Sequence, residues 1–250
     1  MDDKNNIILD EKEEENELVN KVKNMIIKNN ICLPKIMINI KEHLEKCDIT
    51  ICTKYKDGRK NSIEDEETIK KLLLEKFPDN IKVPIGERWW YDILVKEECY
   101  GWIPVNIKVA KLKEPINCGN LSLCVYSYTD EKLEFEKQYN NGEMTKILKN
   151  KLDKKEYNND NLKDYYFLVI NKENTKDIII NGTKGLSELT PNINNLPFQI
   201  KWEKNREYKY GGEETIEKKI KEFIICVRKP KPSWTEKFLE NIRNIDIEKI

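Results

Sequence analysis

Two short segments, at residues 89–96 and 102–110, alternate between polar and apolar side chains, and they constrain the fold more than any other part of the chain. Successive side chains of a β-strand point to opposite faces of a sheet, so the alternation predicts two strands. In the second segment the apolar side chains occupy the odd positions of 103–109 and form one continuous buried face. Asn106 and Lys108 are therefore expected to project together from the other face.

Asp92 lies in the first segment, on the face that also carries Trp90 and Leu94. If the two strands pair, the side chains of Asp92, Asn106 and Lys108 converge on one surface. Metal-dependent hydrolysis of a phosphodiester uses such a surface, because carboxylate oxygens bind a hard cation and a lysine orients the water or stabilises charge. The simpler explanation is that two ordinary strands carry these three polar residues by chance.

The rest of the chain predicts helices and strands on both sides of these segments. Apolar residues at helical spacing predict helices over 17–28, 36–46 and 213–228. Ser62 is expected to cap a further helix that ends at Phe77. Apolar runs predict strands over 48–55, 165–170, 177–180 and 196–202, whereas residues 121–128 fit a helix or a strand, and residues 131–163 an exposed helix with loops. This order is typical of a single α/β domain over residues 1–250, with a central mixed β-sheet flanked by helices and an N-terminal helical elaboration.

Composition excludes several kinds of site. The chain has 7 cysteines but no CxxC pair, so we expect reduced, mostly buried thiols rather than disulfides or a zinc knuckle. His43 is the only histidine, which excludes a zinc site built on two histidines and makes a Ser-His-Asp triad implausible. No apolar run approaches the length of a membrane span and the acidic N-terminus does not resemble a signal peptide, so we expect a cytoplasmic protein with no membrane partner.

The spacing of the polar residues resembles a known family. Asp92 is followed after 13 residues by Asn106 and then, after one more, by Lys108. With the preceding helix that carries Glu67, this pattern resembles the core of the PD-(D/E)xK nucleases. Three blocks are similar to type II restriction endonucleases of the EcoRV/HincII-like branch, at residues 87–92, 103–108 and 194–202. The resemblance extends over roughly residues 62–240.

The resemblance implies a role for each residue of the pattern. Asp92 matches the central metal-binding aspartate, the carbonyl of Ile107 the main-chain metal ligand, and Lys108 the catalytic lysine. Asn106 stands where most members have Asp or Glu. An amide oxygen can still bind Mg²⁺ but adds no negative charge. Glu67 matches a supporting acidic residue of the preceding helix, and it is expected to supply the missing charge.

The function implied is that of a type II restriction endonuclease, which hydrolyses duplex DNA at a short specific sequence with Mg²⁺. A homodimer is implied as well, because two active sites are needed to cut both strands, and so is a cognate DNA methyltransferase in the same system. Residues 62–240 would form the nuclease core, and residues 1–60 a DNA clamp or a dimer interface. Two alternatives stay open: a structure-specific repair or resolving nuclease, and a non-catalytic DNA-binding protein whose metal site is disabled at Asn106.

Polar side chains around the predicted strands are candidates for contact with DNA. Lysine and arginine suit phosphate, while asparagine and glutamine match the edge of adenine. The candidates are Arg88, Lys111, Lys113, Asn117, Asn120, Gln199 and Lys201. A solvated polar surface explains them equally well. The formal net charge of +0 does not favour a nucleic-acid partner, although a local basic groove can coexist with an acidic remainder.

Overall fold

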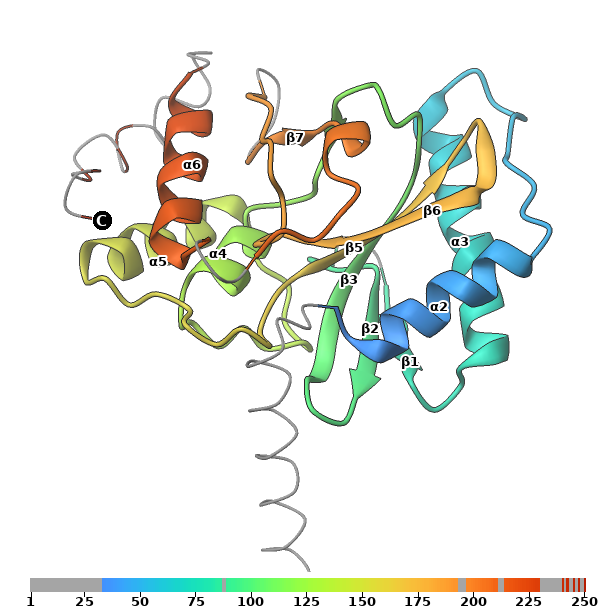
Figure 1. Cartoon of the computed structure of the whole chain (residues 1–250), viewed down its shortest axis with the longest axis horizontal. Coiled ribbons are helices and arrows are strands. Elements are labelled where there is room, and N and C mark those ends of the chain that lie inside the picture. Colours follow the sequence, from blue (N-terminus) through green and yellow to red (C-terminus); the bar gives the residue numbers. More distant parts are fainter. Residues whose placement is uncertain are drawn as a thin grey trace, which may run out of the picture.

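A computed structural model describes residues 33–86, 89–192, 197–210 and 214–229, and the single residues 240, 242, 245, 247 and 250. At its centre lies a five-stranded sheet of order β1-β2-β3-β5-β6 (Figure 1). The strands are β1 (Ile81–Lys82), β2 (Ile93–Glu97), β3 (Gly101–Ala110), β5 (Tyr166–Asn171) and β6 (Asn174–Gly182). The β3–β5 pair is parallel and the other pairs are antiparallel. The predicted mixed sheet of an α/β protein is confirmed.

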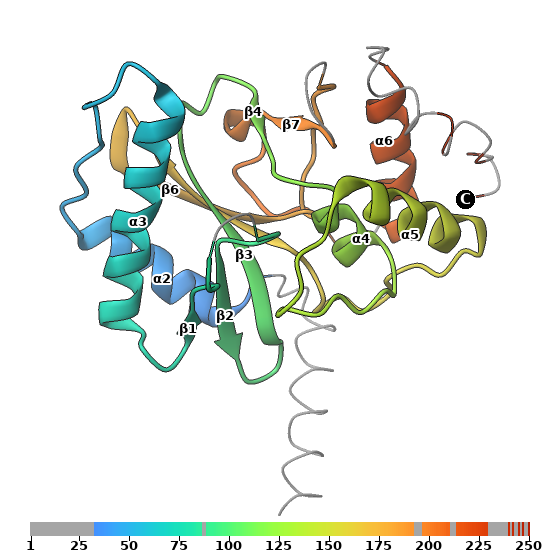
Figure 2. The same cartoon turned by 180° about the vertical axis from the view of Figure 1, so that it is seen from behind.

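Helices cover both faces of this sheet (Figure 1 and Figure 2). On one side lie α2 (Lys35–Lys46) and α3 (Gly58–Lys76). On the other side lie α4 (Ser122–Tyr128), α5 (Asn141–Asp153) and α6 (Ile216–Arg228). A second, two-stranded sheet joins β4 (Ile116–Asn117) to β7 (Gln199–Ile200), and a 3-10 helix, η1 (Trp202–Lys204), follows it. None of the helices in the described ranges combines the length and the apolar character of a membrane span.

Each face of the sheet has its own hydrophobic core. Ile103, Val105 and Ile107 of β3 pack with the apolar side chains of α2 and α3. Phe167 and Val169 of β5 pack on the other side, with the apolar side chains of α4 and α6. The alternation predicted for β3 is therefore confirmed, because its odd-numbered side chains belong to the first core.

The start of α3 differs from the prediction. Its N-cap is Asp57, whose side chain accepts a hydrogen bond from the Arg59 N–H (2.9 Å). Ser62 lies inside the helix, where its hydroxyl donates to the Gly58 carbonyl (3.0 Å). The predicted cap at Ser62 is wrong because the earlier aspartate already satisfies a free N–H of the first turn. The end at Phe77 is confirmed.

Residues 48–55 form no strand, so that prediction is wrong. The backbone there is held by side chains of α3: the Cys52 N–H donates to Asp65 (2.7 Å), and the Tyr55 N–H donates to Asn61 (2.9 Å). These bonds give two backbone N–H groups of the segment an acceptor without a neighbouring strand. The alternation in this segment therefore does not correspond to strand pairing.

The other predicted elements fared as follows. Helices over 36–46 and 213–228 and strands over 165–170 and 177–180 are confirmed, with the last helix beginning at Ile216, and residues 121–128 form the helix α4. Within 131–163 a helix is confirmed, but α5 is less exposed than expected because Met144, Leu148 and Leu152 are buried. Of 196–202, only Gln199–Ile200 is a strand among the described residues. The helix predicted over 17–28 lies outside the described residues, and the six described cysteines are free thiols.

Candidate active site

The candidate site lies where strand β2 stops covering the edge of β3. The ladder between them begins at the pair Ile93–Val105, so Asp92 is the residue just before β2 rather than a member of it. Asp92 continues the edge with its own groups: its N–H donates to the Val105 carbonyl (2.9 Å), and its Oδ2 accepts from the Ile107 N–H (2.7 Å). One carboxylate oxygen of Asp92 is thereby fixed against the backbone of β3.

The carbonyl of Ile107 faces the same edge. In a strand the N–H and C=O of one residue point to the same side. Because the Ile107 N–H is directed at Asp92, its carbonyl oxygen opens onto the space beside that carboxylate. This is the main-chain group to which the family resemblance gives the role of a metal ligand.

Asn106 and Lys108 project together from β3, as predicted. Asn106 is buried, and its Oδ1 has no hydrogen-bond partner among the described residues. The loop before α4 closes over it: a Cβ added to Gly119 would lie 3.8 Å from Asn106 Nδ2. A buried acceptor without a partner costs about 1–3 kcal/mol, which a ligand at that oxygen would offset.

Glu66 of α3 is the second acidic side chain of the site. Its Oε1 lies 3.9 Å from Lys108 Nζ, and both side chains are mostly buried. Burial, and after it the charge of Asp92, raise the pKa of Glu66 from 4.5 to about 7, although Lys108 and Lys70 act in the opposite direction. Glu66, Asp92 and Lys108 thus form one electrostatic group, built from α3, the residue before β2 and the second half of β3.

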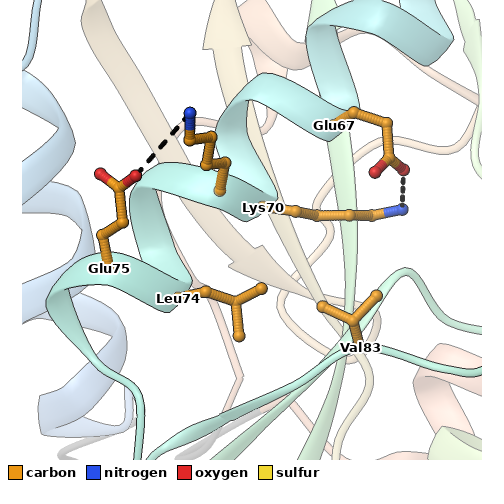
Figure 3. A pocket seen from close by; sticks show the side chains of 6 residues that line it. Glu67, Lys70, Leu74, Glu75 and Val83 are labelled. Atoms are coloured by element: carbon orange, nitrogen blue, oxygen red, sulfur yellow. Dashed lines mark hydrogen bonds and ion pairs between the residues drawn. The ribbon is translucent and has the colours of Figure 1, made fainter.

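Glu67, which the sequence analysis assigned to this role, points elsewhere. Its side chain is 65% exposed and pairs with Lys70 across 2.9 Å, at the rim of an open hollow that Leu74 and Val83 also line (Figure 3). Neighbouring helical residues point about 100° apart, so Glu66 and Glu67 cannot share a direction. The structure therefore places Glu66, and not Glu67, beside Asp92 and Lys108.

A signal for Glu66 was present in the sequence. The buried stripe of α3 runs through Asp65, Ile69 and Leu73. Glu66 precedes Ile69 by three positions and Leu73 by seven, which places it on the sheet-facing side of the helix. Glu67 has no such relation to the stripe.

The candidate DNA-contacting residues differ in exposure and in their hydrogen-bond partners. Lys111 and Lys113 are exposed, and Lys111 pairs with Glu114 (3.3 Å). Asn120 lies two residues before α4, and its Oδ1 accepts a hydrogen bond from the N–H of Ser122, the first residue of that helix (2.9 Å). Two of the candidates meet side by side, namely Asn117 and Gln199. Of the other two, Lys201 is half-buried and Arg88 lies outside the described residues.

The oxygen atoms at the edge of β3 fit a hard divalent cation. Within the described ranges no group of three or more His, Cys, Asp and Glu side chains could hold a metal ion. The available set is mixed instead: the carboxylates of Asp92 and Glu66, the carbonyl of Ile107 and the unpaired amide oxygen of Asn106. Mg²⁺ is commonly held by one or two carboxylates, with water and substrate completing its shell. The donor set meets that requirement.

Comparison with known proteins gives no family: no family model matches the chain, and no curated protein matches it.

Proposed function

We propose that the protein is a Mg²⁺-dependent nuclease that cuts duplex DNA at a short specific sequence, as type II restriction endonucleases do. The observation that carries the proposal is the convergence of Glu66, Asp92 and Lys108 at the uncovered edge of β3. Two acidic groups and one lysine around a backbone carbonyl are the elements that metal-dependent phosphodiester hydrolysis requires.

In this proposal two carboxyl side chains and one main-chain carbonyl bind the cation. Asp92 and Glu66, with the carbonyl of Ile107, would hold Mg²⁺, which would neutralise charge on the scissile phosphate and activate the attacking water. The bond from the Ile107 N–H orients Asp92 before any ligand arrives. Such preorganisation matters because a ligand fixed in place needs no reorganisation during the reaction.

Lys108 would act on the reacting groups. Its ammonium carries positive charge into a partly buried position beside Glu66. There it can orient the attacking water and stabilise the extra negative charge of the five-coordinate phosphorus. The ion pair with Glu66 holds the Lys108 ammonium beside the two carboxyl groups of the site.

Glu66 would replace the carboxylate that the sequence lacks at position 106. With a pKa of about 7, Glu66 is partly protonated at neutral pH, so cation binding and its ionisation are coupled. Asn106 then adds a neutral amide oxygen. The proposed site thus contains two carboxyl side chains despite the asparagine, and cation binding would favour the ionised form of Glu66.

The proposal extends to partners. Cutting both strands of a duplex would take two copies of the site, so a homodimer is part of it. A sequence-specific nuclease also requires protection of the host DNA, for which a cognate methyltransferase in the cytoplasm is expected.

The test is digestion of phage DNA by the full-length protein with Mg²⁺, resolved on a gel. Discrete fragments that disappear with a chelator support the proposal. A smear, or nicking that depends on DNA structure, would instead indicate a structure-specific nuclease. Retention of DNA without cleavage would indicate a binding protein, the alternative favoured by the amide at Asn106.

A further inference from the structure

Three amide side chains meet on the small β4–β7 sheet. Asn117 of β4 and Gln199 of β7 are directly opposite each other in that sheet. The Oδ1 of Asn117 accepts two hydrogen bonds, one from Asn192 Nδ2 (2.9 Å) and one from Gln199 Nε2 (3.2 Å). These residues, Asn117, Asn192 and Gln199, are the amide cluster.

The bonds within the amide cluster fix the orientation of its members. An amide oxygen has two lone pairs, and both lone pairs of Asn117 Oδ1 are used. With the Asn192 and Gln199 amides placed as they are, turning the Asn117 amide over would set its NH₂ group against two donors. Asn192 is buried and anchors the arrangement, while Asn117 is exposed and Gln199 is half-buried.

The hydrogen-bonding groups of Gln199 that are not used within the amide cluster match the edge of one base, adenine. One Nε2 hydrogen is directed to Asn117, which leaves a second Nε2 hydrogen and the Oε1 acceptor. Adenine presents an acceptor, N7, beside a donor, N6, in the major groove, and this pair complements one amide. Guanine presents two acceptors there, N7 and O6, which a single remaining hydrogen cannot satisfy.

The amide cluster also lies close to the candidate active site. Asn117 is two residues from Gly119, whose Cβ position is 3.8 Å from Asn106 Nδ2. Consecutive Cα atoms are about 3.8 Å apart, so Asn117 and Gly119 are separated by at most about 8 Å. Asn117 therefore belongs to the segment whose next residues cover Asn106 of the candidate site.

We propose that the amide cluster recognises an adenine in the DNA sequence that the protein cuts. Gln199 contacts the N6 and N7 edge of the base, and Asn117 and Asn192 position the Gln199 amide. This inference rests on the proposed nuclease function and specifies part of its substrate.

The test determines base preference separately from cleavage. The ends of phage-DNA fragments made by the wild-type protein are sequenced, and the site is rebuilt in short duplexes in which each adenine is replaced by 7-deaza-adenine. At one adenine the replacement is expected to lower cleavage about 10- to 100-fold, the range of one good amide–base contact. Gln199→Ala is expected to lose the preference for A·T over G·C at that position alone, and Gln138→Ala, at the only other glutamine, to keep it.

The positioning role of Asn117 has its own readout. Asn117→Leu is expected to lower the A·T over G·C ratio, whereas Asn117→Asp retains the two acceptors and hence the ratio, even though its charge weakens overall binding. Unchanged base preference in Gln199→Ala, or a site with no sensitive adenine, would overturn the adenine contact and leave the nuclease function standing. Failure of the wild-type protein to bind or cut any DNA would overturn both.

Discussion

Replacing Glu66 by glutamine is expected to stabilise the metal-free protein at alkaline pH. Burial and the charge of Asp92 raise the pKa of Glu66 to about 7, above its ordinary value of 4.5. A carboxyl whose pKa is raised on folding contributes stability that is complete below pH 4.5 and is lost as the pH rises through 7. Glutamine has nearly the same shape and no charge, so the variant escapes this loss.

The size of the effect follows from the pKa difference. A rise from 4.5 to about 7 corresponds to about 3 kcal/mol, and local relaxation leaves an expected gain of about 1–3 kcal/mol for Glu66→Gln at pH 8.5. Below pH 4.5 the variant and the wild type should differ little. The matched control is Glu67→Gln, whose exposed side chain predicts a change within about 0.5 kcal/mol at both pH values.

The assay is urea unfolding followed by tryptophan fluorescence, at pH 4.5 and 8.5, in a chelator. Adding Mg²⁺ at pH 8.5 should then stabilise the wild type more than Glu66→Gln, because the cation binds the ionised carboxylate. Parallel stability curves for the wild type and Glu66→Gln across this pH range would refute the placement of Glu66 beside Asp92.

Three further predictions concern the same edge of the sheet and the helix that supplies Glu66. Lys108→Ala should lower DNA cleavage at least about 100-fold in single-turnover assays while DNA binding in a gel-shift assay stays within a few-fold; wild-type-like cutting would remove Lys108 from the chemistry. Asn106→Asp adds a carboxylate beside Asp92 and Glu66, so its melting temperature should fall in a chelator and recover with Mg²⁺. Equal melting under both conditions would argue against a cation at that position. Asp57→Ala removes the N-cap of α3 and should lower the free energy of unfolding by about 1 kcal/mol, measured by urea unfolding; no change would mean that the Arg59 N–H is satisfied otherwise.

The centre of the fold was predictable because burial imposes a period of two. One face of β3 packs on α2 and α3, so its apolar residues alternate along the sequence. That alternation also fixed the common direction of Asn106 and Lys108. Asp92 was harder to place, because it ends the ladder with side-chain and backbone bonds that no periodicity records.

The acidic residue of α3 was predictable in principle. The prediction of Glu67 followed a family pattern and not the buried stripe of the helix, which passes through Asp65, Ile69 and Leu73 and favours Glu66 over Glu67. In contrast, the strand predicted at 48–55 failed for a non-local reason. Its backbone is held by Asp65 and Asn61 of α3, and a local alternation contains no information about that partner.

The amide cluster could not be predicted as a unit. Asn117, Asn192 and Gln199 come from separate segments, and they meet only because β4 pairs with β7. The sequence singled out Asn117 and Gln199 by residue type. It contained no signal for Asn192, whose importance lies in a buried hydrogen bond.

The most direct test of the proposed active site is a comparison of DNA cleavage by Glu66→Gln and Glu67→Gln on the same phage DNA with Mg²⁺. The two glutamates are adjacent in the sequence, but only Glu66 lies beside Lys108 and Asp92. We expect Glu66→Gln to lose at least about 100-fold in cleavage rate and Glu67→Gln to cut like the wild type. Equal cutting by the two variants, or a loss confined to Glu67→Gln, would contradict the site at the edge of β3.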